Sequence, residues 1–574
     1  MKKFSIAIVM LSFVSAAAFA QTATRGRTVS PLALNAAKSS LLAKYSQAEL
    51  EKGVYVGSNF CLACHTSKAS YKDTNHASFI RRPIEQLSLV AGKGVIADYD
   101  GNKIDDFRQG LDFNTISSPF DKYKPNAPKL SVENGTYFVA IGTLKMPVAF
   151  TLAGQRNGSD QRFTVKVPVT DTPGKLSIDN YFAPIQYSPK SGWAAYNPDR
   201  WYDSTNAPKF AAGIGSASLV GSSTSPSSHG GGCVGCHTPG LRSMDKTAAG
   251  EFAPNIAPAV LYTSLDPTVV DYEGDGEMEQ MNIGCENCHG PGSLHILAGG
   301  DGAKIINPKT LTAQAQIELC AQCHVTSKSV PNGTYSWPYN DATNTRWTPQ
   351  ATQAGQPLSS FYTMAGTLFP DGKHYNGGRP YNAFSTSAHA NFAAHTVGCP
   401  ECHDPHAEGE GMLLRETMVE DNYTIKTSAE DNTLCLACHA KYGPFADFNR
   451  GDVYESTQGN LVALDKVAKT VERHTHHPYA PERMMGLSRC TGCHMTAGGH
   501  SFDVLGPEET INYADKGTGM ANSCANGCHN TQVNIFSLGI KGTVSGYNNP
   551  FDVSLAKALK PFFGEGGAWW NTKP

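Results

Sequence analysis

All sixteen cysteines of this 574-residue chain fall into eight pairs, and a histidine directly follows the second cysteine of every pair. Seven pairs read C-x-x-C-H, the spacing at which two thiols form thioethers to one haem c and the histidine binds its iron. The eighth pair is one residue longer. In chain order they are called motifs 1 to 8: Cys61/Cys64/His65, Cys233/Cys236/His237, Cys285/Cys288/His289, Cys320/Cys323/His324, Cys399/Cys402/His403, Cys435/Cys438/His439, Cys490/Cys493/His494 and Cys524/Cys528/His529. We therefore predict eight covalently bound haem c groups.

Other uses of paired cysteines have to be weighed against haem. A lone C-x-x-C pair also occurs in thioredoxin-like redox sites and in zinc sites. An even number of cysteines in an exported protein is typical of disulfides. The histidine after all eight pairs favours haem over these alternatives, and no cysteine is left over. In the stretched motif 8, Gly527 precedes the second cysteine and relieves crowding in the wider loop.

The first twenty residues are typical of a secretory signal peptide. Lys2 and Lys3 precede a mostly apolar run over residues 4–14, and Ala18-Phe19-Ala20 matches an A-x-A cleavage site. The apolar run is too short to span a bilayer, and we expect no transmembrane segment elsewhere. The sequence predicts an exported protein, located in the periplasm or outside the cell at its surface.

Composition excludes one class of partner. Charged residues make up only 17% of the chain, the formal net charge is −3, and no basic run is present. Nucleic-acid binding is therefore not expected. The 56 glycines and 34 prolines predict a chain rich in loops.

Motif spacing divides the chain, because the interval between motifs 1 and 2 is far longer than any other. Within it, Phe163, Val165, Val167 and Val169 alternate with polar residues or proline, as in a half-buried strand, and residues 137–141 and 148–152 also read as strands. The predicted parts are a signal peptide at 1–20, an N-terminal segment with the first haem at 21–78, a β-rich haem-free module at 79–212, a flexible Gly/Ser linker at 213–232, a seven-haem domain at 233–530 and a C-terminal tail at 531–574.

Three pairs of closely spaced motifs form an internal repeat: motifs 3 and 4, motifs 5 and 6, and motifs 7 and 8. A further histidine follows the first motif of each pair, namely His295, His406 and His500. The second motif of each pair has no such follower.

Eleven histidines lie outside the motifs, enough to bind all eight irons from the second face. Many of them cluster around motifs, which favours ligation over a role as ordinary surface or core residues. The expected distal ligands are His76, His295, His389, His395, His406, His474, His477 and His500, with His229, His374 and His476 in reserve. Met495 directly follows His494 and cannot reach the opposite face of the same haem.

The motifs with their flanking histidines resemble the octahaem c-type cytochromes, within the multihaem cytochrome c superfamily. The resemblance covers residues 229–530 and the first haem, and is carried by Cys285-Glu-Asn-Cys-His-Gly-Pro-Gly-Ser-Leu-His295, Cys399-Pro-Glu-Cys-His-Asp-Pro-His406 and the stretch from His474 to Met495. It implies a mostly irregular and α-helical fold organised around stacked haems. Residues 77–228 match no family.

The resemblance implies two functions. Irons with histidine on both faces have no site for substrate and relay electrons, whereas an open iron can do chemistry. We expect a relay in respiratory or extracellular electron transfer, with other redox proteins as donor and acceptor, or with further copies of the chain in a conductive filament. The alternative is an octahaem oxidoreductase of a small nitrogen or sulfur compound, similar to hydroxylamine oxidoreductase or tetrathionate reductase. All eight motifs end in histidine, which counts against the nitrite reductases, whose catalytic motif often ends in lysine.

The motif count yields a first prediction. After expression with haem maturation, the intact mass of the protein should equal the mature chain plus eight haems, because each motif supplies two thiols for thioether bonds. A mass that fits only seven haems would contradict the count, and the stretched motif 8 would then be the first to check by peptide mapping.

Overall fold

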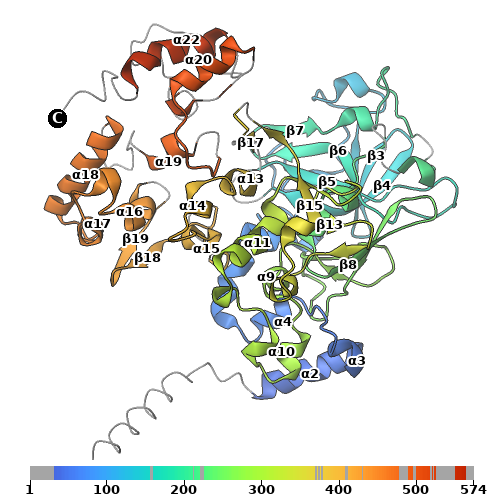
Figure 1. Ribbon diagram of the computed structural model, residues 1–574. Helices are drawn as coiled ribbons and strands as arrows, with labels where there is room; N and C mark the ends of the chain where they lie inside the picture. Colours follow the sequence, from blue (N-terminus) through green and yellow to red (C-terminus); the bar gives the residue numbers. More distant parts are fainter. Residues whose placement is uncertain are drawn as a thin grey trace, which may run out of the picture.

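The computed structural model describes residues 31–154, 159–210, 213–219, 225–368, 371–372, 375–376, 379–407, 412–428, 431–477, 489–495, 499–517, 520, 522–524 and 550–563. The predicted signal peptide, His374, and Cys528 and His529 of motif 8 lie outside these residues. Figure 1 shows a β-rich part, a neighbouring part built of short helices and hairpins, and a helical C-terminal part.

A seven-stranded antiparallel sheet occupies most of the long interval between motifs 1 and 2 (Figure 1). Its strands are β1 (Ile80–Arg81), β2 (Lys129–Glu133), β3 (Thr136–Ile141), β4 (Leu144–Ala153), β5 (Gln161–Val165), β6 (Tyr181–Ser188) and β7 (Gly192–Ala195). Strands β2 to β7 follow one another across the sheet in chain order, and β1 pairs with the end of β4, with Ile80 opposite Leu152. Tight turns join β2 to β3 and β3 to β4, whereas longer connections join β4 to β5 and β5 to β6.

The strands that the sequence predicts are present as β3, β4 and β5, but β5 is not half-buried. Phe163 and Val165 point into the core as expected, yet Thr164 and Lys166 are buried as well. The Thr164 hydroxyl donates to the carbonyl of Phe150, 2.9 Å away, and the Lys166 ammonium donates to the carbonyl of Tyr272, 2.5 Å away. Polar groups can be buried on the second face because each finds a backbone acceptor.

The sheet has a core of its own, built on aromatic side chains. The rings of Phe107, Phe163 and Trp193 lie 5.2–6.2 Å apart between centres, and all three side chains are buried. The Trp193 indole N–H donates to Asp106 Oδ2 at 2.7 Å, which satisfies the only polar atom of that side chain. Aromatic clusters of this kind contribute large buried apolar areas, so this region carries its own stabilising core.

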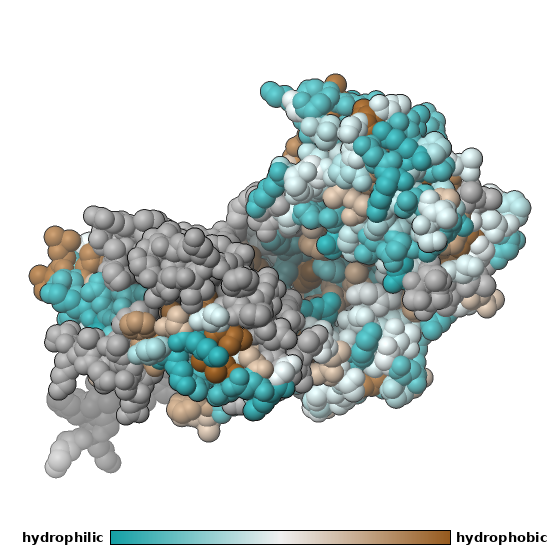
Figure 2. Space-filling model, turned by 90° about the horizontal axis from the view of Figure 1, so that it is seen from above, coloured by the Kyte–Doolittle hydropathy of each residue, from teal (hydrophilic) through white to brown (hydrophobic). Residues whose placement is uncertain are grey.

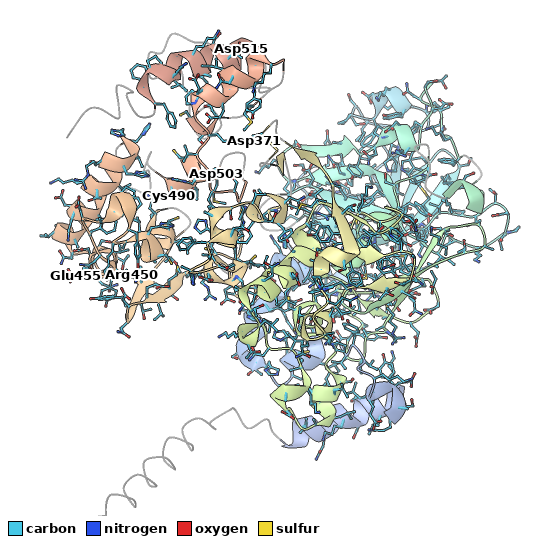
Figure 3. All side chains as sticks on the ribbon, in the orientation of Figure 1. Asp371, Arg450, Glu455, Cys490, Asp503 and Asp515 are labelled. Atoms are coloured by element: carbon cyan, nitrogen blue, oxygen red, sulfur yellow. The ribbon has the colours of Figure 1, made fainter. Side chains whose placement is uncertain are left out.

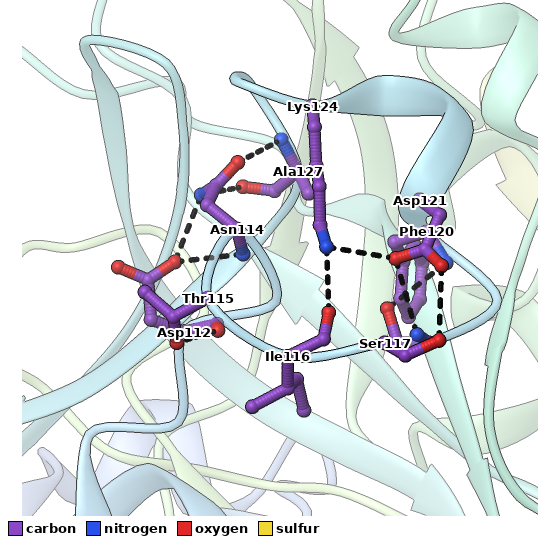
Figure 4. A network of polar contacts seen from close by, with 10 residues as sticks. Asp112, Asn114, Thr115, Ile116, Ser117, Phe120, Asp121, Lys124 and Ala127 are labelled. Atoms are coloured by element: carbon purple, nitrogen blue, oxygen red, sulfur yellow. Dashed lines mark hydrogen bonds and ion pairs between the residues drawn. The ribbon is translucent and has the colours of Figure 1, made fainter.

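A loop preceding β2 is held by side-chain bonds to backbone (Figure 4). The Asn114 amide donates to the carbonyl of Ala127 at 2.9 Å and accepts from the Ala127 N–H at 2.9 Å. The Lys124 ammonium donates to the carbonyl of Ile116 at 2.7 Å and pairs with Asp121 at 2.9 Å. These bonds give the loop the order that a regular strand would otherwise supply.

The rest of the described chain consists of short helices and two-stranded hairpins. The helices are α2 (Pro31–Lys44), α3 (Gln47–Leu50), α4 (Ser58–Leu62), α5 (Asn75–Ser78), α6 (Asp106–Gln109), α7 (His229–Gly232), α8 (Val234–His237), α9 (Cys285–His289), α10 (Ser293–Leu297), α11 (Ala313–His324), α12 (Gln350–Gln353), α13 (Tyr381–Phe384), α14 (Ala388–Asn391), α15 (Cys399–Cys402), α16 (Thr433–His439), α17 (Arg450–Thr457), α18 (Leu461–Thr475), α19 (Cys490–His494), α20 (Pro507–Asp515) and α22 (Pro550–Leu559). The hairpins pair β8 (Leu241–Lys246) with β9 (Phe252–Ile256), β10 (Val269–Val270) with β11 (Glu279–Gln280), β12 (Ser327–Ser329) with β15 (Tyr362–Met364), β13 (Tyr339–Asn340) with β14 (Thr345–Arg346), β16 (Thr367–Leu368) with β17 (Tyr375–Asn376), and β18 (Thr417–Glu420) with β19 (Tyr423–Lys426).

A second apolar cluster joins the sheet to the motif-bearing part of the chain. It combines Phe150 and Phe182 of the sheet with Val234 and Cys236 of motif 2 and with Trp337. The predicted linker ends inside this region, because Ser225 and His229 are buried. The exterior of the β-rich part, at the right of Figure 2, is mostly hydrophilic to neutral. None of the helices in the described residues has the length and apolar character needed to cross a membrane.

The separate core yields a second prediction. Residues 79–219, expressed without haem maturation, should give a β-type circular dichroism spectrum and unfold cooperatively, because the aromatic cluster lies wholly within them. In this fragment Phe107→Ala should lower the free energy of unfolding by about 3–5 kcal/mol, while Lys93→Ala on the surface should leave it unchanged. A disordered spectrum for the unsubstituted fragment would contradict the prediction.

Candidate functional site

The described motifs lie on short helices or at their ends. Motif 3 spans α9, motif 7 spans α19, and motif 4 forms the last turn of α11. Residues three and four apart share one face of a helix, so the first cysteine, the second cysteine and the histidine of such a motif point to the same side. A glycine stands directly before each of the helices α9 and α15.

Six motif histidines each face a histidine from outside the motifs. The partner comes from a different helix or loop, often from a distant part of the sequence. The ring centres of the pairs are separated as follows: His65 and His295 6.2 Å, His76 and His324 6.2 Å, His289 and His406 6.2 Å, His389 and His439 5.9 Å, His403 and His500 6.4 Å, and His474 and His494 6.4 Å.

These separations fit a metal held between two imidazoles. A metal–imidazole bond is about 2 Å long, and the ligating nitrogen lies about 1 Å from the ring centre, so two rings on opposite faces of one metal have centres about 6 Å apart. Ordinary aromatic pairs also lie about 4.5–7 Å apart between centres. What favours a shared metal is therefore the repetition of the arrangement, in which a motif histidine faces a histidine from outside the motifs six times. The residues present therefore fit a haem iron bound from both faces.

Backbone carbonyls fix the orientation of several of these rings. His289 Nδ1 is 2.8 Å from the carbonyl of Ile306, and His295 Nδ1 is 2.8 Å from that of Asp301. Likewise His403 Nδ1 is 2.9 Å from the carbonyl of Met412, and His494 Nδ1 is 2.9 Å from that of Phe502. A carbonyl accepts only from the protonated nitrogen, so Nδ1 carries the hydrogen and Nε2 keeps its lone pair for a metal.

Burial keeps the deeper histidines neutral. It lowers the pKa of His237 to about 4 and the pKa of His324 to about 4 as well, with smaller contributions from neighbouring cationic groups. A metal binds the neutral imidazole, since a protonated ring has no free lone pair. These rings are thus ready to bind a metal across the whole neutral range of pH.

Contacts between motifs place them in a definite order. Four pairs of thiols from different motifs touch: Cys61 and Cys285, Cys236 and Cys323, Cys320 and Cys399, and Cys435 and Cys490, the last at the start of α19 in Figure 3. The Gln322 amide of motif 4 donates to the carbonyl of Asn287 in motif 3 at 2.8 Å. Burial, and then the charge of Cys435, raise the pKa of Cys402 to about 11, which places motif 5 beside motif 6.

Each of the four thiol contacts uses only one thiol of a motif. Seven of the described cysteines lie outside them: Cys64, Cys233, Cys288, Cys402, Cys438, Cys493 and Cys524, all partly exposed. Because α4 ends at Leu62, Cys64 lies beyond the helix, where its N–H donates to the carbonyl of Cys61 at 3.2 Å. Cys493 stays within α19, and its carbonyl accepts from the Ser523 hydroxyl at 2.7 Å. Thioether attachment stays a prediction at all eight motifs.

A buried carboxylate fixes motif 1 against motif 3. Glu286 of motif 3 accepts hydrogen bonds from the N–H groups of Val56 and Gly57, which precede motif 1, and from Gly292, each at 2.8 Å for its shortest contact. Burial raises its pKa to about 7, opposed by these three bonds. Sequence reasoning missed this residue, because a glutamate inside C-x-x-C carries no signal of its long-range partners.

Two expected ligands, His395 and His477, are not among the six facing pairs of the described residues. His395 Nε2 is 3.0 Å from Glu401 Oε2, and its side chain is 67% exposed. His477 Nδ1 lies 2.7 Å from the carbonyl of Thr475 in its own loop, and the reserve residue His476 ends α18 in a left-handed conformation. The remaining reserve described by the structure, His229, is fully buried close to motif 2. The ring of His237 itself stacks on Phe79, with centres 4.8 Å apart.

Comparison with known proteins agrees with the motifs. Residues 389–443, which contain motifs 5 and 6, match the family described as a doubled CXXCH motif. No curated protein is similar enough to count as a match. Two solved structures are similar at low scores. The outer cell wall cytochrome OcwA is 18% identical over 82% of this chain and 83% of that chain, with a TM-score of 0.42. The undecaheme cytochrome from the S-layer of Carboxydothermus ferrireducens is 16% identical over 88% of this chain and 66% of that chain, with a TM-score of 0.35.

The doubled-motif match and the repeated C-x-x-C-H spacing together support a multihaem c-type cytochrome. The structural scores are too low to add an argument about function. What the chain does with its haems is therefore argued from the geometry of its own residues.

The carboxylate between motifs 1 and 3 yields a third prediction. Glu286→Ala leaves three buried N–H groups without an acceptor, so the holoprotein should lose about 3 kcal/mol or more of stability. Urea unfolding followed by tryptophan fluorescence measures the loss. Glu277→Ala, which removes an exposed carboxylate nearby, is the matched control and should leave the midpoint unchanged. Equal midpoints for both variants would show that Glu286 does not hold the two motifs together.

Proposed function

We propose that this chain is an exported octahaem c-type cytochrome that relays electrons along haems bound by histidine on both faces. The observation that carries the proposal is the set of six facing histidine pairs, with ring centres 5.9–6.4 Å apart. When bound, haem c takes up and releases single electrons. In this proposal each pair holds one iron from both sides, so no coordination position remains for a substrate.

The proposed ligands for six haems are the motif histidines with their facing partners. The distal residues are His295 for motif 1, His406 for motif 3, His76 for motif 4, His500 for motif 5, His389 for motif 6 and His474 for motif 7. His395 is left out, because its Nε2 already contacts Glu401. Ligation by neutral imidazole from both sides gives a six-coordinate iron suited to electron transfer.

The contacts between motifs support a path for the electrons. Thiol contacts connect motif 1 to 3, 4 to 5 and 6 to 7, and a side-chain hydrogen bond connects motif 3 to 4. The charge of Cys435 acts on Cys402, which indicates that motifs 5 and 6 are neighbours as well. Motif 2 touches motif 4 through Cys236 and Cys323 and so joins the line from the side. We infer a line with a branch at motif 4.

Location and coordination together indicate which partners the proposed relay would have. The signal-like N-terminus supports export to the periplasm or the cell surface. A relay without a substrate site exchanges electrons with other redox proteins, or with further copies of the chain if these assemble into a filament. The oxidoreductase alternative requires at least one open iron, so the spin state of the irons separates the two functions.

Ligand removal yields a fourth prediction. In the oxidised wild-type holoprotein, electron paramagnetic resonance should show low-spin irons for all six pairs. His295→Ala should turn one iron high-spin, because the second imidazole is lost. His395→Ala is the matched control: it removes an exposed histidine close to motif 5 and should leave the spectrum unchanged. A high-spin signal in the His395→Ala variant with none in His295→Ala would reverse the assignment. A large high-spin signal in the wild type would favour the enzyme.

A further inference from the structure

His229 has one ring nitrogen with a partner and one without. Its side chain is fully buried, four residues before Cys233, and the Cys233 N–H donates to the carbonyl of His229 at 2.8 Å. The ring lies edge-on to Phe150, with centres 4.9 Å apart, and Nε2 has no hydrogen-bond partner. Leaving a buried polar atom without a partner is destabilising. Such an atom calls for a ligand, and motif 2 is the nearest haem motif.

The charge of motif 2 also affects the pKa of His229. Burial lowers the pKa of His229 well below its usual value, and the next cause is the charge of His237. His237 is the motif histidine of motif 2, and its own distal partner was not among the six facing pairs. His229 thus lies beside motif 2, and its backbone is bonded to the first cysteine of that motif.

Tyr272 and Asp179 determine which nitrogen of His229 is protonated. The Tyr272 hydroxyl donates its hydrogen to Asp179 Oδ1 at 3.0 Å. The hydroxyl oxygen lies 3.1 Å from His229 Nδ1, and it can only accept there, because its single hydrogen is already used. Nδ1 therefore carries the hydrogen of the imidazole. The lone pair remains on Nε2, the atom without a partner.

Asp179 is held rigidly at the end of this chain of bonds. Its carboxylate accepts from the N–H groups of Gly230 at 2.9 Å and Asn180 at 2.7 Å, and from the hydroxyl of Ser228. Asp179 and Tyr272 are both fully buried. Hydrogen bonds in such a water-free environment are strong, and they leave the three residues little freedom to rearrange.

We propose that His229 is the distal ligand of the haem on motif 2, and that Asp179 and Tyr272 act as positioning residues that lower the reduction potential of this haem. The proposal rests on the proposed function, because it requires a haem at motif 2. A buried carboxylate that accepts a hydrogen bond, here through a phenol, makes the imidazole a better electron donor to its metal. Stronger donation stabilises the oxidised iron over the reduced iron. Asp179 lies within the region expected to have no part in haem binding.

The proposed positioning residues affect the reduction potential of the haem at the side branch. The haem on motif 2 joins the line only at motif 4, through Cys236 and Cys323. With Asp179 and Tyr272 in place, this haem accepts an electron less readily than the same haem would without them.

The test uses four variants of the full holoprotein. His229→Ala identifies the haem: one iron should change from low-spin to high-spin in electron paramagnetic resonance. Asp179→Asn and Tyr272→Phe should keep all irons low-spin but raise the midpoint potential of that haem, by about 59 mV for a tenfold change in its one-electron equilibrium. Glu251→Gln is the matched control. Glu251 accepts from the N–H of Asp179 at 3.0 Å without touching His229, so its loss should not move the potential.

The outcomes test three claims separately: that His229 is the ligand, that Asp179 and Tyr272 position it, and that motif 2 carries a haem. All irons low-spin in His229→Ala would overturn the ligand assignment. A potential that moves equally in Glu251→Gln and in Asp179→Asn would overturn the role of Asp179 and Tyr272. If Asp179→Asn fails to accumulate, Tyr272→Phe decides alone, because it removes only the hydroxyl. A wild-type mass lacking the haem of motif 2, with Cys233 and Cys236 unmodified, would instead contradict the proposed function.

Discussion

The pairing of histidine rings from separate segments is the contact on which the proposed haem arrangement depends. His76 and His324, and likewise His403 and His500, come from distant parts of the chain, and each pair sits at the separation expected for a shared metal. In the proposed holoprotein each such pair closes a long loop through a metal bond. Binding energy of this kind is folding energy, so a chain rich in short helices and loops can be held in one arrangement.

The β-rich part has its own core, yet it also shapes the haem part. Phe150 and Phe182 pack against motif 2, and Asp179 reaches His229 through Tyr272. The sheet thus supplies a rigid, water-free wall beside the proposed branch. Rigid second-layer contacts are what set the orientation and electron donation of a metal ligand.

The sequence predicted the features that depend on residues close together in the chain, namely the haem motifs and the strands β3 and β4. The motifs stand out because two cysteines and a histidine must lie close together on a short segment, and β3 and β4 follow local patterns of apolar residues. Contacts between distant segments escaped it. Clustering near a motif favoured His395, whose ring contacts Glu401, over His229, which faces the core under the sheet. Likewise the burial of Lys166 depends on the carbonyl of Tyr272, about a hundred residues away.

The same limit applies within the motifs. Cys61 and Cys64 are equivalent in the C-x-x-C-H pattern, yet only Cys61 meets a thiol of motif 3 in the four contacts between motifs. Cys490 and Cys493 differ in the same way, since Cys490 meets Cys435 of motif 6. Which thiol of a motif approaches its neighbour depends on how distant helices pack, and the local spacing carries no information about that.

The most direct test of the account is a cryo-electron microscopy structure of the purified holoprotein, read haem by haem for its axial ligands. The account predicts an iron between each of the six facing histidine pairs, and motif 2 beside motif 4 at the side of the line. An iron held by a different residue, or left open, at any of the six pairs would contradict it. The same particles would show whether copies of the chain assemble end to end.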